Sequence, residues 1–308
     1  MSILINKYKQ LRNTYGSRWP LYFVIRRPWG NLISDRSYLK IDYFLNLGKK
    51  LNLNNPVTFN EKMQWLKLYN RNPIYTTMAD KLEVKNYITE KIGDRYVIKL
   101  LGSWDTFDEI DFDLLPEKFV LKTTHGCGGM VICKNKDDLD VEKARKIINK
   151  SLKADYFYQG REWPYKNIKK RILAEEYMQD GDSENLTVYK IFNLSGIPTI
   201  IQVIQDDKTA KETIDYFDTE WNLLDLKQNF PNSPNHLPKP RTLDDMLELA
   251  RKLSEGMPFI RTDFYEINGE VYFSEFTFFS DDGFAEFHPG EWDEKLGEKI
   301  DLKLSYRP

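Results

Sequence analysis

Hydrophobic and polar positions along the chain form two kinds of pattern, short apolar or alternating runs and longer runs with helical spacing. The short runs predict strands over residues 95–101, 119–124, 130–133, 171–178, 186–193, 198–204, 259–267 and 270–278. The longer runs predict helices over residues 58–70, 80–92, 140–152 and 243–254. Strands and helices mixed in this order predict an α+β class with α/β elements and more than one lobe.

The last two predicted strands are joined by Asn-Gly at 268–269, the strongest short signal for a two-residue hairpin turn. Such a turn places Asp263 opposite residues 273–274, one diagonal step from Glu275. Arg261 shares a strand face with Asp263, because side chains two residues apart point the same way. Two carboxylates and a guanidinium on one face suit Mg²⁺ carried by a nucleotide. The competing interpretation is a solvated strand face with a salt bridge.

A glycine-rich loop over residues 123–129 separates two predicted strands. Its backbone N–H groups can wrap phosphate oxygens, and Lys122 just before it can place an ammonium against them. The loop is not a Walker A motif, because no Gly-Lys-Ser/Thr follows the glycines. It is not a dinucleotide fingerprint either, because that motif lies between a strand and a helix. A plain hairpin turn is the competing interpretation.

Two adjacent acids, Glu175 and Glu176, come near the end of the predicted strand over 171–178. A strand that opens into a hinge exposes backbone N–H and C=O groups to the edge of an adenine ring. A neighbouring glutamate can then accept a hydrogen bond from the exocyclic amine. The competing interpretation is a pair of solvated glutamates.

The composition excludes several classes of protein. The 308 residues are 41% apolar and 30% charged, so the chain is not globally disordered, and its net charge of −2 disfavours a generally basic nucleic-acid binder. Two cysteines cannot form a disulfide scaffold, which favours a reducing compartment. No run reaches the roughly 18 apolar residues of a membrane-spanning helix, and the first residues lack the apolar run of a signal peptide. We therefore expect a cytoplasmic protein without a nucleic-acid partner.

Positive charge is concentrated at one end of the chain. Residues 1–50 hold ten Lys or Arg and two Asp, a net charge of +8, whereas the remainder carries −10. Within this stretch, residues 19–29 combine aromatic side chains with arginines, which suits an anionic membrane surface or an anionic polymer. The pattern predicts peripheral contact with the inner face of a membrane. The competing interpretation is an amphipathic arm packed on the body, with its charges solvated.

Three further groups of residues have weaker support. His125, Cys127 and Cys133 have a spacing that supplies three zinc ligands, but no fourth is close in sequence, so zinc is disfavoured. Cys127 as a nucleophile lacks an identifiable His or Asn partner. Aromatic residues in predicted loops either fill the core or stack on a sugar ring. These are Trp163, Tyr165 and Trp221.

Taken in order, the motifs resemble the ATP-grasp fold and, more narrowly, the TupA-like ATP-grasp proteins of surface-polysaccharide biosynthesis. The resemblance extends over roughly residues 50–303. The stretches that carry it are 55–62, 78–81, 115–122, 174–178, 189–192, 261–265, 272–277 and 292–297. It implies an ATP-grasp fold, in which two α+β lobes grip ATP, with a basic N-terminal extension.

The resemblance also implies a division into four segments. Residues 1–54 form the basic, aromatic extension, and residues 55–116 form a region that precedes the ATP-grasp lobes. Residues 117–182 form the central lobe with the glycine-rich lid, and residues 183–308 form the C-terminal lobe with the metal-binding hairpin.

Residue roles follow from the same resemblance. The implied ATP-binding residues are Lys81, Lys122, His125, Gly126, Gly128, Gly129, Glu175, Glu176 and Met178. The implied Mg²⁺ ligands are Asp263, Glu275 and Thr277, and the implied catalytic residues are Arg261 and Lys190. The lysines would neutralise phosphates, the loop over 123–129 would close as a lid, and Glu175 would meet the adenine amine. Arg261 would stabilise charge on the transferred phosphoryl group.

The sequence departs from the family pattern at two of these places. Thr277 stands where an Asn ligand is usual, although its hydroxyl keeps an oxygen for the metal. Val188 stands where close relatives have an Asp before Tyr-Lys, so the ribose or metal contact that the resemblance implies there is not supported by the residue present.

The activity implied is that of an ATP- and Mg²⁺-dependent carboxylate–amine ligase that acts through an acyl phosphate. The expected substrates are a uronic acid of a capsule or cell-wall glycan and the amine of an amino acid. Three alternatives stay open: a kinase of a sugar or glycan hydroxyl, a non-catalytic nucleotide- or glycan-binding scaffold, and, with less support, a glycosyltransferase. The sequence names neither substrate and leaves the oligomeric state open.

Overall fold

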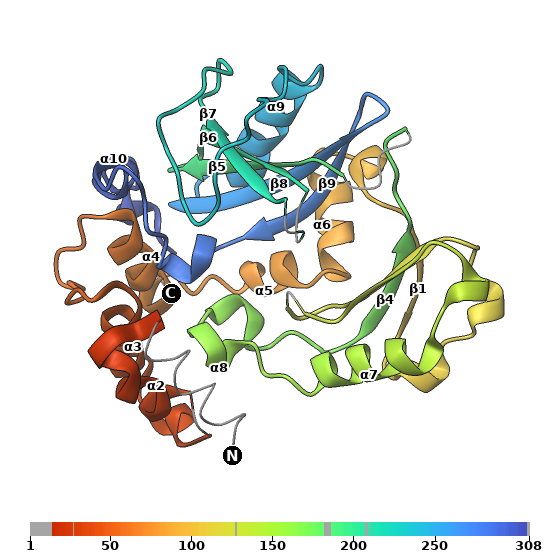
Figure 1. Ribbon diagram of the computed structural model, residues 1–308, viewed down its shortest axis with the longest axis horizontal. Coiled ribbons are helices and arrows are strands. Elements are labelled where there is room, and N and C mark those ends of the chain that lie inside the picture. Colours follow the sequence, from red (N-terminus) through yellow and green to blue (C-terminus); the bar gives the residue numbers. More distant parts are fainter. Residues whose placement is uncertain are drawn as a thin grey trace.

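The computed structural model describes residues 14–306 apart from 27, 127, 182–185, 207, 208 and 210. Its described part contains two antiparallel sheets, one of four strands and one of five, with helices between and around them (Figure 1). This arrangement confirms the α+β class. Residues 1–13 and Cys127, for which the sequence makes predictions, lie outside the described residues.

The first sheet has the strand order β1-β4-β2-β3. Its strands are β1 (Leu100–Trp104), β2 (Phe119–Thr123), β3 (Met130–Cys133) and β4 (Ile172–Glu176). Helix α7 (Val141–Leu152) covers one face, with Ala144 and Ile148 buried against Phe119 and Leu121 of β2. Side chains on β2 alternate between buried and half-buried positions, as expected for a strand with one face on the core.

The second sheet has the order β7-β6-β5-β8-β9. Its strands are β5 (Val188–Leu194), β6 (Ile197–Gln205), β7 (Thr213–Phe217), β8 (Phe259–Ile267) and β9 (Glu270–Thr277). Helix α9 (Leu243–Ser254) buries Met246, Leu249 and Ala250 against this sheet. Both predicted hairpins are present: β5 joins β6 through Ser195-Gly196, and β8 joins β9 through Asn268-Gly269.

Five further helices of the described residues precede β1, lie between β3 and β4, or follow β9 in the chain. They are α4 (Phe59–Tyr69), α5 (Ile74–Ala79), α6 (Glu83–Ile92), α8 (Phe157–Gly160) and α10 (Glu291–Glu298). The predicted capping box begins α4: the Thr58 hydroxyl accepts from the Glu61 N–H at 3.2 Å, and the Glu61 carboxylate accepts from the Thr58 N–H at 3.4 Å. Helices α5 and α6 lie between the two sheets (Figure 1).

Single turns of 3-10 helix occupy many of the connections. They cover Gly16–Arg18, Pro28–Leu32, Asp94–Tyr96, Phe107–Glu109, Phe112–Leu114, Lys136–Asp138, Trp163–Tyr165, Ser280–Gly283 and Leu302–Leu304. The turn over Ser280–Gly283, called η8 below, directly follows the strand that carries the predicted metal ligands.

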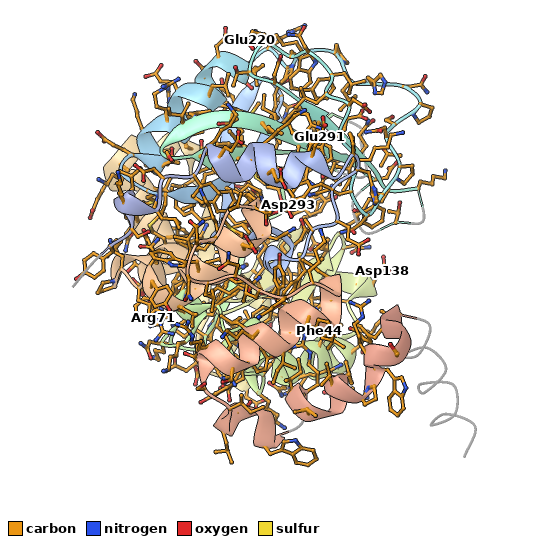
Figure 2. All side chains as sticks on the ribbon, turned by 90° about the vertical axis from the view of Figure 1, so that its left-hand side faces the viewer. Phe44, Arg71, Asp138, Glu220, Glu291 and Asp293 are labelled. Atoms are coloured by element: carbon orange, nitrogen blue, oxygen red, sulfur yellow. The ribbon has the colours of Figure 1, made fainter. Side chains whose placement is uncertain are left out.

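The N-terminal arm, residues 14–54, packs on the body of the protein. It contains α2 (Trp19–Ile25) and α3 (Asp35–Leu47), and its cluster of buried side chains meets Trp65 of α4 and Phe284. Members of that cluster are Ile25, Tyr38, Leu39, Tyr43, Leu45, Leu51 and Leu53. The arm lies along one side of the molecule beneath α10 (Figure 2). For the described residues, the interpretation as a packed amphipathic arm is confirmed.

Two parts of the strand pattern were predicted wrongly. The run over 95–101 is largely not a strand, because Tyr96 and Ile98 pack into the core outside a ladder and β1 begins only at Leu100. Strand β7 was missed, because Asp215 interrupts its apolar run. The Asp215 carboxylate is buried, and it accepts hydrogen bonds from the backbone N–H of Ser233 and from His236 Nδ1.

Candidate nucleotide-binding site

A cavity of about 340 Å³ lies where the two sheets and α6 come together. Among the described residues, nine of the predicted site residues line it: Lys81, Lys122, Gly126, Gly128, Gly129, Glu175, Lys190, Asp263 and Glu275. The remaining five, His125, Glu176, Met178, Arg261 and Thr277, are not among the lining residues. We call this space the nucleotide cavity.

One wall of the nucleotide cavity holds a carboxylate between two lysines. Glu175 on β4 accepts from Lys122 Nζ and from Lys85 Nζ, each at 2.6 Å. The strand register explains the first contact: Val120 of β2 is paired with Glu175, and Lys122 is the next residue along on the same face. Both Glu175 oxygens therefore have lysine partners, and the predicted contact with an adenine amine stays a prediction.

Glu175, Lys122 and Lys85 shift one another's pKa values. Burial raises the pKa of Glu175, but Lys122 and Lys85 outweigh it and lower the pKa overall, so the carboxylate is ionised. Burial lowers the pKa of Lys122, but the Glu175 charge outweighs burial and raises it. For Lys85 burial is the larger effect, and the pKa is lowered despite Glu175. Lys122 is thus the more firmly charged of the two.

The opposite wall holds the two acids predicted to bind metal. Asp263 on β8 and Glu275 on β9 are directly paired, which corrects the predicted diagonal placement. A β-bulge causes the difference: Phe264 pairs with Phe273, so Ser274 is an extra residue on β9 that shifts the register by one. The bulge thus brings the two carboxylates face to face.

Lysines flank both acids of this pair. Lys81 Nζ lies 3.5 Å from Glu275 Oε2, and Lys190 Nζ lies 3.8 Å from Asp263 Oδ2. Burial raises the pKa of Glu275, but Lys81, Lys190 and Arg261 outweigh it and lower the pKa to about 2. The side chain of Glu275 is 41% exposed, so an ionised oxygen ligand faces the nucleotide cavity.

This pair fits a magnesium ion that arrives with a nucleotide. Mg²⁺ commonly takes one or two protein carboxylates and completes its octahedron with phosphate oxygens and water. Among residues 14–306 as described, no group of three or more His, Cys, Asp or Glu is close enough to hold a metal. Asp263 and Glu275 would therefore be the protein's ligands. Zinc at His125 and Cys133 has no support in this part of the chain.

Arg261 is a buried partner of the metal-binding pair. Its Nε and Nη2 each donate to Asp263 at 2.8 Å, and Nη2 also donates to the Thr277 hydroxyl at 2.9 Å. Burial lowers its pKa, but Asp263 outweighs burial and raises it further above the ordinary value. Arg261 therefore orients Asp263, and Thr277 contacts Arg261. The roles of Arg261 in catalysis and of Thr277 as a metal ligand stay predictions.

The glycine-rich loop forms the edge of the nucleotide cavity. The Thr123 N–H donates to the Gly129 carbonyl at 3.1 Å, which closes the loop. Gly129 has φ +72°, and a Cβ there would come within 2.4 Å of Ser151 on α7. A Cβ at Gly126 would come within 2.4 Å of the Tyr156 ring. Glycine is thus required by close packing, while the predicted closure as a lid stays untested.

The predicted residues outside the lining have other surroundings. His125 is buried, with Nε2 3.1 Å from the Ser151 carbonyl, and burial lowers its pKa, so it is neutral. The Glu176 side chain is exposed, and its backbone N–H donates to the Lys99 carbonyl. Neither these two nor Met178 lines the nucleotide cavity, so their predicted roles in ATP binding have no direct support.

Sequence analysis missed Lys85 and the apolar wall of the nucleotide cavity. Lys85 lies four residues after Lys81, a spacing that puts both on one face of a predicted helix, so this signal was available. The apolar wall had no such signal, because its members come from four separate elements. They are Val84, Ile88, Val97, Ile98, Val188 and Phe273. An apolar wall next to a charged one suits a planar base joined to phosphates.

Comparison with known proteins agrees with this geometry. The model of the TupA-like ATP-grasp family matches residues 61–301. No curated protein matches the chain. The D-alanine–D-alanine ligase from Helicobacter pylori is 16% identical, with a TM-score of 0.41 over 79% of this chain and 69% of that one. The ATP complex of the Bacillus anthracis D-alanine–D-alanine ligase is 14% identical, with a TM-score of 0.45 over 74% and 66%.

The ATP-grasp ligase PsnB, complexed with minimal precursor, Mg and ADP, is 10% identical, with a TM-score of 0.39 over 83% of this chain and 64% of that one. The family match includes every residue that lines the nucleotide cavity, and it begins after the N-terminal arm. The chain therefore belongs to the TupA-like ATP-grasp family and has the ATP-grasp fold.

Proposed function

We propose that the protein is an ATP- and Mg²⁺-dependent carboxylate–amine ligase that links an amino acid to a uronic acid of a surface polysaccharide. The observation that carries the proposal is the pairing of Asp263 with Glu275 at the wall of a cavity that also holds four lysines and a glycine loop. Membership of the TupA-like ATP-grasp family supports the reaction class. The substrates rest on the sequence resemblance alone.

The reaction consists of two balanced steps. A carboxylate oxygen of the acid attacks the γ-phosphorus of ATP, the bond to the β-phosphate oxygen breaks, and ADP leaves. The amine then attacks the acyl carbon, loses a proton to solvent and expels phosphate, which leaves an amide. Mg²⁺, when bound, neutralises charge on the phosphates and fixes their geometry.

The chain's own residues prepare the first step. Lys122 and Lys81 lie where they can hold phosphate oxygens, and Lys190 approaches Asp263 from the neighbouring strand. Arg261 fixes Asp263 through two hydrogen bonds, so the carboxylate oxygens have a set direction before metal arrives. The apolar wall and glycine loop limit the access of water to the phosphates.

A non-catalytic nucleotide-binding scaffold is the second candidate. The position of Thr277 favours it, because this replacement for the usual Asn contacts Arg261 and does not line the nucleotide cavity. Phosphorylation of a sugar hydroxyl is a further outcome that the same experiment distinguishes, since it consumes ATP without an amine.

The test begins with calorimetric titration of Mg-ATP, followed by assays of ADP and phosphate release with uronic acids and amino acids. A ligase releases both products only when acid and amine are present. ADP release with a stable phosphoester, and no need for an amine, would identify a kinase. Binding of Mg-ATP without turnover on any acceptor pair would favour the scaffold.

We also propose peripheral contact of the arm with an anionic membrane. Among the described residues, no helix is long and apolar enough to cross a bilayer. The arm nevertheless exposes 57% of Trp29 and 88% of Leu32, and its surface carries Arg18 and Lys40. The test is cosedimentation with phosphatidylglycerol vesicles. Replacing Trp29 and Leu32 with Ser should abolish it, and unchanged binding would contradict the proposal.

Deletion of residues 1–50 is a poorer test. It would remove the side chains that cover Trp65 and Phe284, and so would disturb the body of the protein as well as the arm.

A further inference from the structure

A second cavity, of about 620 Å³, lies between the arm and the body. We call it the arm cavity. Tyr22, Ile25, Arg26 and Asn31 line it from the arm, and Tyr158, Gln159 and Asp282 line it from the body. All four arm residues precede the range that the family model matches.

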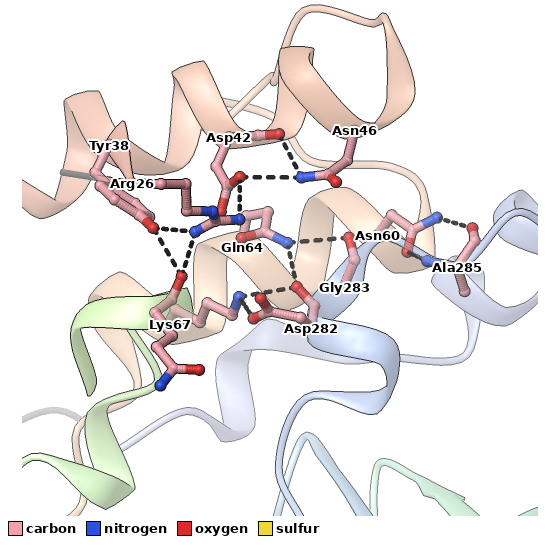
Figure 3. A network of polar contacts seen from close by, with 11 residues as sticks. Arg26, Tyr38, Asp42, Asn46, Asn60, Gln64, Lys67, Asp282, Gly283 and Ala285 are labelled. Atoms are coloured by element: carbon pink, nitrogen blue, oxygen red, sulfur yellow. Dashed lines mark hydrogen bonds and ion pairs between the residues drawn. The ribbon is translucent and has the colours of Figure 1, made fainter. Parts of the chain in front are cut away.

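Arg26 is held in place at the wall of the arm cavity. Its Nη2 donates to Asp42 at 2.9 Å, and its Nη1 donates to the Gln159 carbonyl at 2.5 Å and to the Tyr38 hydroxyl (Figure 3). Among the described residues, these bonds use three of its five N–H groups. The Nε–H and the second Nη2–H form the edge of a guanidinium that matches a carboxylate, and the side chain is 25% exposed.

Asp282 is held just as firmly on the other side. Its backbone carbonyl accepts from Lys67 Nζ at 2.8 Å and from Gln64 Nε2 at 2.9 Å, and Lys67 also pairs with its carboxylate (Figure 3). Asp282 has φ +57°, a left-handed conformation that costs energy in any residue with a side chain. These buried contacts keep the side chain at the wall of the arm cavity despite that cost.

Contacts through η8 link the arm cavity to the nucleotide cavity. Asp282 lies on this turn two residues after Ser280, whose hydroxyl accepts from Arg261 Nη1 at 3.2 Å. Arg261 in turn holds Asp263, which lines the nucleotide cavity. The series of contacts from Asp282 to Asp263 thus consists of hydrogen bonds and one short turn of the backbone. A molecule seated in the arm cavity would contact Asp282, which these contacts connect to the metal-binding pair.

The chemistry of the lining suits an acidic saccharide. Tyr22 and Tyr158 provide aromatic faces for the C–H face of a pyranose ring. Asp282 and Asn31 provide acceptors and donors for hydroxyl groups, and Arg26 provides a fork for a carboxylate. Arg26 already shares its charge with Asp42, and its remaining N–H edge is the part that a carboxylate can reach.

We propose that the arm cavity binds a further uronic-acid unit of the same glycan whose reacting carboxylate enters the nucleotide cavity. This inference rests on the proposed ligase function. It makes the N-terminal arm part of the substrate site. It also requires the protein to prefer acidic oligosaccharides over a single uronic acid, because only an oligosaccharide can reach both places.

The experiment compares glucuronic acid with glucuronic-acid oligosaccharides of defined length, in assays of ADP release by the full chain. The variants are Asn31→Asp, which places a negative charge in the arm cavity, and Tyr158→Ala, which removes a partly exposed ring. Lys40→Ala is the matched control, because it removes a cation from the exposed surface of the same arm. Arg26→Ala is avoided, because Asp42 would lose its charged partner.

We expect both variants to raise the KM for oligosaccharides about tenfold, because Asn31→Asp repels a carboxylate and Tyr158→Ala removes an aromatic surface that packs on the sugar ring. The KM for Mg-ATP and for glucuronic acid, and the melting temperature, should stay within twofold and about 2 °C of wild type. Equal KM values for oligosaccharides in wild type and both variants would overturn the inference. So would an equal loss in Lys40→Ala, which would indicate general attraction to a basic surface.

Direct binding separates failure of this inference from failure of the ligase. Calorimetry with the oligosaccharides requires no turnover. Binding to wild type that is weakened in Asn31→Asp and Tyr158→Ala would support the arm cavity even if no acid and amine yielded ADP. Absence of oligosaccharide binding to wild type, together with turnover of free glucuronic acid, would overturn the arm cavity and leave the ligase in place.

Discussion

The nucleotide cavity can be compared with the arm junction, the region where Arg26 and Asp42 of the arm lie near Asp282 and Glu162 of the body. Both regions contain carboxylates, but opposite influences set their charge. In the nucleotide cavity, the lysines around Glu275 outweigh burial and lower its pKa to about 2. At the arm junction, burial is the larger effect, and it raises the pKa of Asp42 to about 6 despite Arg26. Burial and the neighbouring Asp282 raise the pKa of Glu162 to about 8.

This difference in what sets the pKa of the acids indicates a different role for each region. An acid surrounded by lysines stays ionised at any physiological pH, and a metal can replace the lysines as its partner. An acid whose pKa is raised mainly by burial ionises only at higher pH, and its ionisation in the folded state costs stability. An ionised acid surrounded by lysines is typical of a site that binds a charged ligand. The acids of the arm junction tie the arm to the body with an energy that depends on pH.

The largest expected effect concerns Glu275, the metal-binding acid whose pKa the surrounding lysines lower. Glu275→Gln should reduce ADP formation at least about 100-fold, because an ionised metal ligand becomes a neutral amide. Glu270→Gln on the exposed end of the same strand is the matched control and should retain activity. A Glu275→Gln variant with wild-type turnover would show that this carboxylate does not hold the metal, and the comparison of the two regions would lose its functional meaning.

The glycine loop gives the next largest effect. Gly129→Ala should destabilise the protein by about 2–4 kcal/mol, because it adds both a left-handed conformation and a clash with Ser151. Gly181 is the matched control: its φ is +52°, but no atom of the described residues lies within 4 Å of a Cβ there, so Gly181→Ala should cost only about 1–2 kcal/mol. Chemical denaturation measures both.

The affinity for Mg-ATP is a second quantity to measure in the Gly129→Ala and Gly181→Ala variants. The Gly129 variant should also bind Mg-ATP more weakly, since the loop must move to admit the methyl group, whereas the Gly181 variant should bind like wild type. Equal stability losses in the two variants would show that close packing on α7 does not fix the loop.

Much of the nucleotide cavity could be predicted because its residues lie in short, local motifs. Lys122 with its glycine loop and Asp263 with Glu275 each belong to one hairpin, so spacing alone brings them together. The bulge at Ser274 could not be predicted, because an Asn-Gly turn fixes the register only near the turn. Contacts between segments far apart in the sequence could not be predicted either.

The arm junction shows this second limit clearly. Lys67 of α4 pairs with Asp282, and Arg26 pairs with Asp42 and bonds to Gln159, yet more than 100 residues separate several of these partners. No periodicity connects positions so far apart, because their meeting depends on how whole elements pack. Charge and aromatic content identified the arm as unusual, but not as the wall of a cavity.

A smaller effect tests the lysines that hold Glu175. Lys122→Met should weaken Mg-ATP binding about tenfold, which corresponds to the loss of one charge-assisted hydrogen bond to phosphate. The fold should persist, because Lys85 still neutralises Glu175. Lys134→Met on the exposed surface beyond β3 is the matched control. Calorimetric titration gives both affinities, and an unchanged affinity in Lys122→Met would contradict a phosphate contact for this lysine.

The smallest expected effect is the pH dependence of the arm junction. Glu162 has a folded-state pKa of about 8 against an ordinary value of 4.5, so between these pH values the folded protein holds a proton that the unfolded chain releases. Stability from this group is therefore full below pH 4.5 and is lost as pH rises through about 8. Glu275 and Glu175, whose pKa values are lowered, act in the opposite sense and lose stability only in acid.

Glu162→Gln keeps a neutral hydrogen-bonding side chain and removes the titration. Between pH 6 and 7, wild type should lose about 1 kcal/mol more stability than Glu162→Gln, measured by denaturation at each pH. Glu220→Gln on the surface should follow wild type. Parallel curves for wild type and Glu162→Gln would mean that Lys67 keeps Glu162 ionised in the folded state, and the two regions would then share one rule, in which the nearest cation and not burial sets the charge of an acid.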